Sequence, residues 1–270
     1  MNRPCMTRRY LLPTYLLALW SVILLVIPVW AQNPDPLQQE PAVMAAPENQ
    51  AALKRLQGEY LILVGGPAKR QWEELRIETQ RHDRWWANFV AASNIRTRQL
   101  VGLGVPANAI TWAVFRPGYV RRGQEEGKPL VAWIQELAAK RGAKIFWFDT
   151  QSALVDYINR GNNRASRKIV SFDFFGHSNK YCFLFDYSSE ISGASAIWLH
   201  ETEVKRLSRS AFHPQAFCKS WGCHTGESMS KVWKRSLGVP LYGALGKTDY
   251  VPTGRGQLPE LSTAAGVWAR

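Results

Sequence analysis

The stretch KIVSFDFFG at residues 168–176 decides the fold class. It is a short apolar run that ends at a glycine, which is typical of a buried β-strand. Five other stretches have the same character: YLILVGG (60–66), AITWAVF (109–115), KIFWFDT (144–150), QAFCKSWG (215–222) and VPLYGALG (239–246). The segments between them have helical patterns: 71–101, 128–143, 152–161, 200–212 and 227–238. This alternation predicts an α/β protein with a mainly parallel sheet and helices on both faces.

The N-terminus has the pattern of a secretory signal peptide. Residues 1–10 hold three arginines and no acid, a long apolar run follows, and small or aliphatic residues precede a cleavage site after Ala31. We therefore expect a secreted or periplasmic protein, or a membrane-anchored one if the segment is not cleaved. Residues 32–58 are rich in Pro, Gln and Ala and predict a linker or pro-segment. Residues 59–270 suit one α/β domain.

The chain is basic, with a formal net charge of +13 at pH 7. This charge favours anionic neighbours such as an envelope surface, although like charge can also simply keep a soluble protein dispersed. The sequence has no block of five or six consecutive basic residues. Together with the export signal, this argues against a nucleic-acid partner.

Three cysteines, Cys182, Cys218 and Cys223, follow the signal segment, which is an odd number for an oxidising compartment. One disulfide would leave one free thiol. The pairing Cys182–Cys218 would leave Cys223 free, and three reduced cysteines are the alternative. Cys218, Cys223 and His224 lack the second close pair of ligands that structural zinc sites have, so we expect no metal and no cofactor.

Two of the expected strands end next to reactive side chains. His177 follows 168–176, and Cys223 follows 215–222. If these strands are parallel and adjacent, both side chains emerge at the same edge of the sheet. Cys223 would then lie in a turn between Gly222 and Gly226. The expected helix after it would favour the thiolate, and backbone N–H groups near Gly222 and Cys223 would hold an oxyanion.

This arrangement predicts a dyad that hydrolyses peptide or amide bonds. Cys223 would attack the carbonyl carbon and form a thioester, and His177 would transfer the proton. A peptide or protein is the expected substrate. His224 is a poor base for the neighbouring thiol, because adjacent side chains on an extended segment diverge, so we expect it to line the site.

The stretches IVSFDFFGHS (169–178) and AFCKSWGCHTG (216–226) resemble the caspase-like cysteine peptidases, the group of caspases, legumains, gingipains, clostripains and separases. The histidine precedes the cysteine by 46 residues, a separation similar to that in caspases. The resemblance implies a three-layer α/β sandwich with His177 and Cys223 as catalytic residues. The group has His-Gly where this chain has Gly176-His177-Ser178, so Ser178 would supply the oxyanion-binding N–H.

Members of this group tend to cleave after one residue type. An acidic pocket for Arg or Lys could be formed by Asp173, Asp186, Glu227 or Asp249. Residues 247–249, after the last expected strand, would lie at the same edge as the dyad and shape a substrate groove.

Two other functions fit parts of the sequence. One is a non-catalytic cell-envelope protein that binds a partner through its basic face. The other is suggested by SWGCHTG (220–226), which is similar to the Ser-His-Gly-Cys stretch of L,D-transpeptidases acting on peptidoglycan, with Trp221 in place of the histidine. The basic stretch 110–123 could bind an anion at the end of its strand, or form a solvated loop.

Overall fold

A seven-stranded sheet organises the residues that the computed structural model describes, which are 56–78, 84–189 and 195–270. All of them belong to the unit Asp35–Arg270. The strands are β1 (Glu59–Val64), β2 (Ile110–Phe115), β3 (Lys144–Phe148), β4 (Ile169–Phe175), β8 (Phe212–Ser220), β9 (Leu241–Leu245) and β12 (Val267–Ala269). The predicted signal peptide and nearly all of the predicted linker lie outside the described residues.

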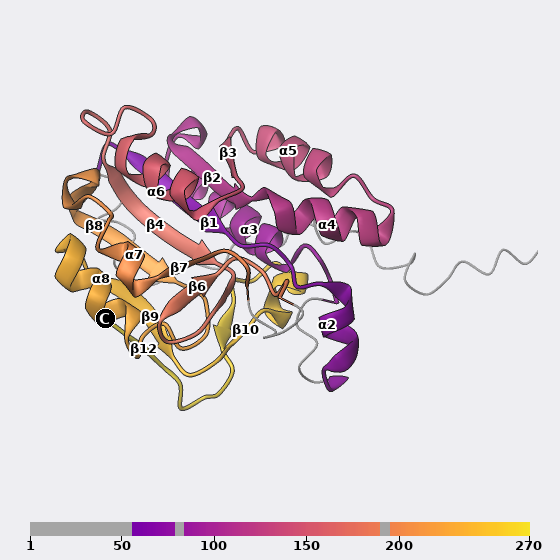
Figure 1. Cartoon of the computed structure of the whole chain (residues 1–270). Helices are drawn as coiled ribbons and strands as arrows, with labels where there is room; N and C mark the ends of the chain where they lie inside the picture. Colours follow the sequence, from indigo (N-terminus) through magenta and orange to yellow (C-terminus); the bar gives the residue numbers. More distant parts are fainter. Residues whose placement is uncertain (1–55, 79–83, 190–194) are drawn as a thin grey trace, which may run out of the picture. The chain divides into compact units, whose positions relative to one another are not determined.

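The strand order is β12-β9-β8-β4-β1-β2-β3, with β4 between β1 and β8 (Figure 1). The six strands from β9 to β3 pair in parallel, and β12 pairs antiparallel with β9 at one edge. The predicted α/β class with a mainly parallel sheet is therefore confirmed.

Side chains of the central strand β1 alternate between two hydrophobic clusters, because successive side chains of a strand point to opposite faces. Leu61 and Leu63 belong to one cluster, to which α6 (Gln151–Arg160) and α8 (Met229–Leu237) contribute apolar residues. The side chains of β1 that alternate with these two leucines belong to the second cluster. Helices α3 (Asn88–Gly102) and α5 (Leu130–Lys140) contribute apolar residues to that cluster. This two-sided burial explains why β1 is apolar at nearly every position.

Local signals in the sequence explain several helix ends. The hydroxyl of Thr150 accepts a hydrogen bond from the backbone N–H of Ala153 and caps the start of α6. Gly238 ends α8 with φ 74°, a left-handed conformation that glycine adopts without steric cost. These ends agree closely with the predicted helices 152–161 and 227–238.

Two predicted elements differ from the structure. The helix expected over 71–101 is two helices, α2 (Arg70–Leu75) and α3. The stretch RPG (116–118) closes the strand before it, since β2 ends at Phe115, but it also begins helix α4 (Arg116–Glu126), because proline fits the first turn of a helix. The arginines of this stretch therefore lie on a helix rather than in a loop. Arg121 and Arg122 pair with Asp186 and Glu126.

The segment between β4 and β8 also departs from the prediction. The expected helix 200–212 is reduced to α7 (Glu201–Val204) and a short 3-10 turn, and β8 already begins at Phe212. The stretch KYCFLFDYS (180–188) predicts a shorter β segment, and part of it belongs to a small antiparallel sheet. This sheet consists of β5 (His177–Ser178), β6 (Cys182–Leu184) and β7 (Trp198–His200).

A second small pair of strands, β10 (Thr248–Asp249) and β11 (Glu260–Leu261), lies between β9 and β12 in the sequence. It brings residues 247–250 towards the ends of β4 and β8 (Figure 1). Within the described residues, none of the helices has the length and apolar character needed to span a bilayer.

Candidate active site

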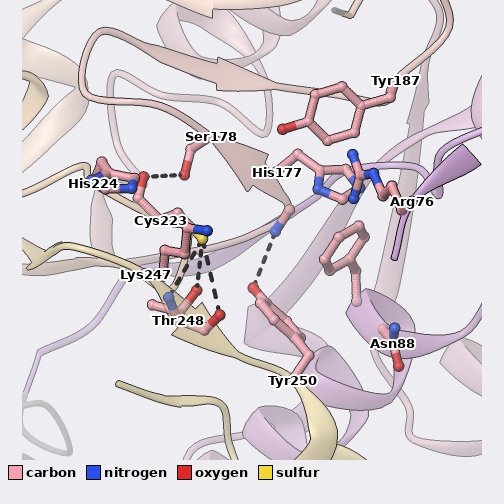
Figure 2. A pocket seen from close by; sticks show the side chains of 12 residues that line it. Arg76, Asn88, His177, Ser178, Tyr187, Cys223, His224, Lys247, Thr248 and Tyr250 are labelled. Carbon is pink, nitrogen blue, oxygen red and sulfur yellow. Dashed lines mark hydrogen bonds between the residues drawn. The ribbon is translucent and has the colours of Figure 1, made fainter. Parts of the chain in front are cut away.

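His177 and Cys223 line one pocket, which has a volume of about 340 Å³ (Figure 2). They follow the carboxyl ends of β4 and β8, which are adjacent and parallel and remain in register up to the pair Phe174–Ser220. The predicted sharing of one edge is therefore present in the structure. Gly176, Ser178 and His224 line the same pocket.

The imidazole of His177 is held between aromatic rings. It packs edge-on against Phe89 with a centroid distance of 5.0 Å, and lies 4.3 Å from the ring of Tyr187. In Figure 2 the imidazole lies beside Tyr187 and Arg76. His177 thus has a defined position in the pocket wall, set by residues that the sequence analysis did not single out.

Ser178 connects the histidine strand to the cysteine turn. Its hydroxyl donates a hydrogen bond of 2.7 Å to the carbonyl oxygen of Cys223. Because neighbouring side chains in the extended β5 point to opposite sides, Ser178 faces the Cys223 backbone while His177 faces Phe89 and Tyr187. The imidazole and the thiol therefore approach the pocket from different directions.

The immediate neighbour of the Cys223 sulfur is Thr248 of β10. The backbone N–H of Thr248 donates to Sγ at 3.4 Å, and the threonine hydroxyl lies 3.5 Å from it (Figure 2). The sequence suggested only that residues 247–249 lie at this edge. Lys247 and Thr248 do line the pocket.

The cysteine turn has an unusual backbone at His224, which adopts φ 61° although it is not glycine. The backbone N–H of His224 donates to the carbonyl of Gly246 at 2.6 Å, and its Nδ1 lies 2.6 Å from a carboxylate oxygen of Glu227. The hydrogen bond with His224 lowers the pKa of Glu227. These contacts hold the strained turn and pair His224 with Glu227.

Gly222 is required by the close approach of the two strand ends. A Cβ atom built at this position would lie 2.2 Å from Oγ of Ser178 and 3.1 Å from the carbonyl oxygen of Gly176. Its backbone N–H already donates to the hydroxyl of Ser220 at 3.3 Å. The N–H of Gly222 therefore already has an acceptor within its own turn.

The helix after Cys223 begins later than expected. Helix α8 starts at Met229, and residues 223–228 form turns. The field of a helix end acts mainly within its first turn, and Cys223 lies before the first turn of α8. The backbone donor that contacts Sγ is the N–H of Thr248.

The carboxylates expected to form an acidic pocket have other partners. Asp173, 1% exposed, accepts hydrogen bonds of 2.9 Å from both Nε of Arg96 and Nε1 of Trp221. Asp186, also buried, accepts from Arg121 at 2.8 Å and from the hydroxyl of Ser195 at 3.1 Å.

The other two candidates are also engaged, since Asp249 accepts from the backbone N–H of Val251 and Glu227 pairs with His224. Among the described residues, none of the four carboxylates lines the pocket, whereas Arg76 and Lys247 do. The predicted acidic pocket is thus corrected to a basic one.

The three cysteines of the described chain are free, so of the two alternatives the structure has three reduced thiols and no bond between Cys182 and Cys218. Burial raises the pKa of Cys218 far above its usual range, and burial together with Glu203 and Glu201 raises that of Cys182 to about 11. Over residues 56–78, 84–189 and 195–270, no group of three or more His, Cys, Asp or Glu side chains could hold a metal ion.

Comparisons with known proteins identified no relative of this chain. No protein-family model matches the chain, and neither does any curated protein or solved structure.

Proposed function

We propose that this protein is a cysteine-dependent peptidase or amidase in which Cys223 is the nucleophile and His177 the general acid and base. One observation carries the proposal. The ends of two adjacent parallel strands present a thiol and an imidazole to a single pocket. A nucleophile and a proton-transfer group at one concave site are what amide hydrolysis by a thioester route needs.

In the proposed reaction, the Cys223 thiol gives its proton to His177 and its sulfur bonds to the substrate carbonyl carbon, so that the carbonyl oxygen becomes an oxyanion. The neighbouring N–H groups of Gly222 and His224 already have acceptors, so the N–H of Cys223 is the donor we assign to that oxyanion. The carbon–nitrogen bond then breaks, and His177 gives its proton to the leaving amine. Water activated by His177 cleaves the thioester, which releases the acid and restores the thiol.

The different directions of the two side chains favour this division of roles. The sulfur is held by Thr248, and the imidazole lies against Phe89 and Tyr187. A substrate amide lying between them would meet the thiol on its carbonyl carbon and the imidazole on its leaving nitrogen. His177 therefore acts chiefly on the leaving group and the incoming water.

The basic wall of the pocket indicates the substrate class. Arg76 lies 4.8 Å from the ring of Tyr187 and 3.4 Å from a carboxylate oxygen of Glu73. The exposed Lys247 lines the same pocket. Guanidinium and ammonium groups at a partly desolvated site favour anionic ligands. We assign to the pocket a peptide that carries a carboxylate close to the scissile bond.

The remaining expectations belong to the same proposal. The parallel sheet with helices is compatible with a caspase-like three-layer sandwich, and we propose that architecture. The arginine-rich start and apolar run of residues 1–31 support export, and the net charge of +13 supports a location near an anionic envelope surface.

The test combines alkylation with turnover. Iodoacetamide near neutral pH should modify Cys223 before Cys182 and Cys218, because burial raises the pKa of the other two thiols. Replacing Cys223 with Ala should abolish cleavage of a peptide library that contains acidic residues, and His177→Ala should lower kcat by about 10²–10⁴-fold. Cys182→Ser is the matched control and should leave cleavage unchanged.

Three results would contradict the proposal. Cleavage that survives Cys223→Ala would exclude this thiol as the nucleophile. No cleavage of any library peptide, with slow alkylation of Cys223, would favour the non-catalytic binding protein. Transfer of an amine to a peptidoglycan peptide, without net hydrolysis, would favour the transpeptidase-like alternative.

A further inference from the structure

The strands β4 and β8 stop pairing directly where the pocket begins. Their last backbone hydrogen bond runs from the N–H of Trp221 to the carbonyl of Phe174, at 2.8 Å. In a parallel ladder, a residue bonds to the two residues that flank its partner. The next bond would therefore join the N–H of Gly176 to the carbonyl of Trp221.

The hydroxyl of Tyr250 occupies that position in the ladder. The N–H of Gly176 donates to the tyrosine oxygen at 3.3 Å, and the tyrosine hydroxyl donates to the carbonyl of Trp221 at 3.2 Å. A hydroxyl can accept and donate at the same time, so it satisfies both backbone groups while keeping them apart. Figure 2 shows the tyrosine reaching this point from below the pocket.

We propose that Tyr250 is a positioning residue whose hydroxyl holds β4 and β8 apart and thereby sets the separation of His177 from Cys223. The histidine lies directly after Gly176, and Cys223 lies two residues after Trp221. A change in the distance between these two backbone groups moves both reactive side chains. The catalytic part of this inference rests on the proposed function, whereas the spacing itself does not.

The ring of Tyr250 supports the same role. It is 8% exposed and packs edge-on against Phe89 at 5.0 Å, and Phe89 in turn packs edge-on against His177 at 5.0 Å. One side chain thus contacts the backbone before the histidine and the ring that holds the imidazole.

The backbone of Tyr250 is itself anchored. Its carbonyl accepts hydrogen bonds from both the N–H and the hydroxyl of Thr253, at 3.0 and 2.6 Å. The 3-10 turn Val251–Arg255 that begins here therefore fixes the starting point from which the side chain reaches the strand ends. A fixed anchor is needed if the hydroxyl is to hold a spacing rather than follow the strands.

The main test is Tyr250→Phe, which removes the hydroxyl and keeps the ring. Without the hydroxyl between them, the N–H of Gly176 and the carbonyl of Trp221 are expected to pair directly and close the gap. We expect kcat to fall about tenfold or more with KM within about threefold, because misplacement affects the transition state more than binding. The matched control is Tyr242→Phe, whose hydroxyl accepts from Arg270 at 3.2 Å and whose ring stacks on Phe217. It should leave kcat unchanged.

A kcat within about twofold of wild type in Tyr250→Phe would overturn the inference. So would equal losses in kcat for both tyrosine variants, since a general loss of packing would explain them.

A second measurement does not depend on hydrolysis. We would measure the rate at which Cys223 is alkylated by iodoacetamide and by the larger N-phenylmaleimide. The ratio of the two rates shows how well a large reagent enters the gap relative to a small one. Tyr250→Phe should lower the rate of the larger reagent about fivefold more than that of the smaller one, since the gap narrows. An unchanged ratio overturns the spacing role, even if the wild-type protein proves to cleave no peptide.

A third measurement needs no variant and applies if Tyr250→Phe fails to fold. In the wild-type protein, the Gly176 amide should exchange with solvent about 100-fold more slowly than in an unstructured peptide, because the buried tyrosine oxygen accepts from it. Exchange of Gly176 at the unprotected rate would overturn the inference.

Discussion

The hydroxyl of Ser178 donates a hydrogen bond of 2.7 Å to the carbonyl oxygen of Cys223. This bond joins the residue after the candidate general base to the backbone of the candidate nucleophile, across a sequence separation of 45 residues. It lies beyond the last backbone bond between β4 and β8. Beyond the point where the two strands stop pairing, a side-chain hydrogen bond thus connects the histidine segment to the cysteine segment.

Ser178→Ala should weaken catalysis more than stability. Loss of the hydroxyl frees the Cys223 carbonyl and loosens the strained turn at His224, so we expect kcat/KM to fall about tenfold. The free energy of unfolding should fall by about 1 kcal/mol, measured by chemical denaturation. Ser166→Ala, in a turn where the hydroxyl bonds only to Asn163, is the control. An equal loss of activity in the control would contradict the assignment.

Gly222→Ala should destabilise the fold and abolish activity, since the added methyl would lie 2.2 Å from Oγ of Ser178. We expect a loss of about 1–3 kcal/mol in the free energy of unfolding. The double variant Gly222→Ala with Ser178→Gly removes the clashing side chain and should recover part of this stability. A single variant with wild-type stability would show that the strand ends do not approach as closely as described.

Asp173→Ala should act on stability and not on substrate choice. Asp173 and Arg96 are each 1% exposed, so removal of the carboxylate leaves a buried charge unpaired. We expect a loss of about 3–5 kcal/mol in the free energy of unfolding, measured by urea denaturation. Asp249→Ala, where the carboxylate is partly exposed, should cost less than about 1 kcal/mol. A change in the preferred cleavage residue in Asp173→Ala would restore the acidic-pocket hypothesis.

Lys219 should make stability rise with pH in an alkaline window. Burial lowers the pKa of Lys219 to about 8. The charge of Asp173 opposes this shift and that of Arg96 adds to it. The indole rings of Trp221 and Trp268 lie 3.6 and 3.9 Å from Nζ of the lysine. Between this value and the ordinary 10.5, the unfolded state binds more protons than the folded state. The unfolding free energy should therefore rise with pH, by at most about 3 kcal/mol. The stabilisation of the cation by the indoles is subtracted from this limit.

Lys219→Met removes the titrating group and is the comparison for this prediction. Unfolding free energies of both proteins would be measured by denaturant titration from neutral pH to above the ordinary lysine range. The difference between wild type and variant should change only within the alkaline window. A difference that stays constant with pH would mean that the lysine titrates alike in both states.

Part of the site could be predicted from local sequence. Apolar runs such as 168–176 identify buried strands, and strands that alternate with helices favour parallel pairing. Parallel strands bring their carboxyl ends to one edge, so the meeting of His177 and Cys223 in one pocket follows from the sequence pattern once β4 and β8 are adjacent, which the structure shows.

Other features could not be predicted, because they depend on contacts between residues far apart in the chain. The partner of Asp173 is Arg96, 77 residues away, and the neighbour of the Cys223 sulfur is Thr248, 25 residues away. Nothing in the composition of either segment distinguishes a buried, paired carboxylate from one that lines a pocket. The acidic-pocket prediction was wrong for this reason.

The sequence by itself determined which segments form the main strands and that these strands pair mainly in parallel. It thereby determined the edge of the sheet at which the reactive side chains gather. Hydrophobic periodicity is local, and it is written into each segment separately. Only the tertiary structure decided the charge of the pocket wall and the insertion of the Tyr250 hydroxyl between two strands. Each of these depends on how segments distant in sequence satisfy one another's polar groups on burial.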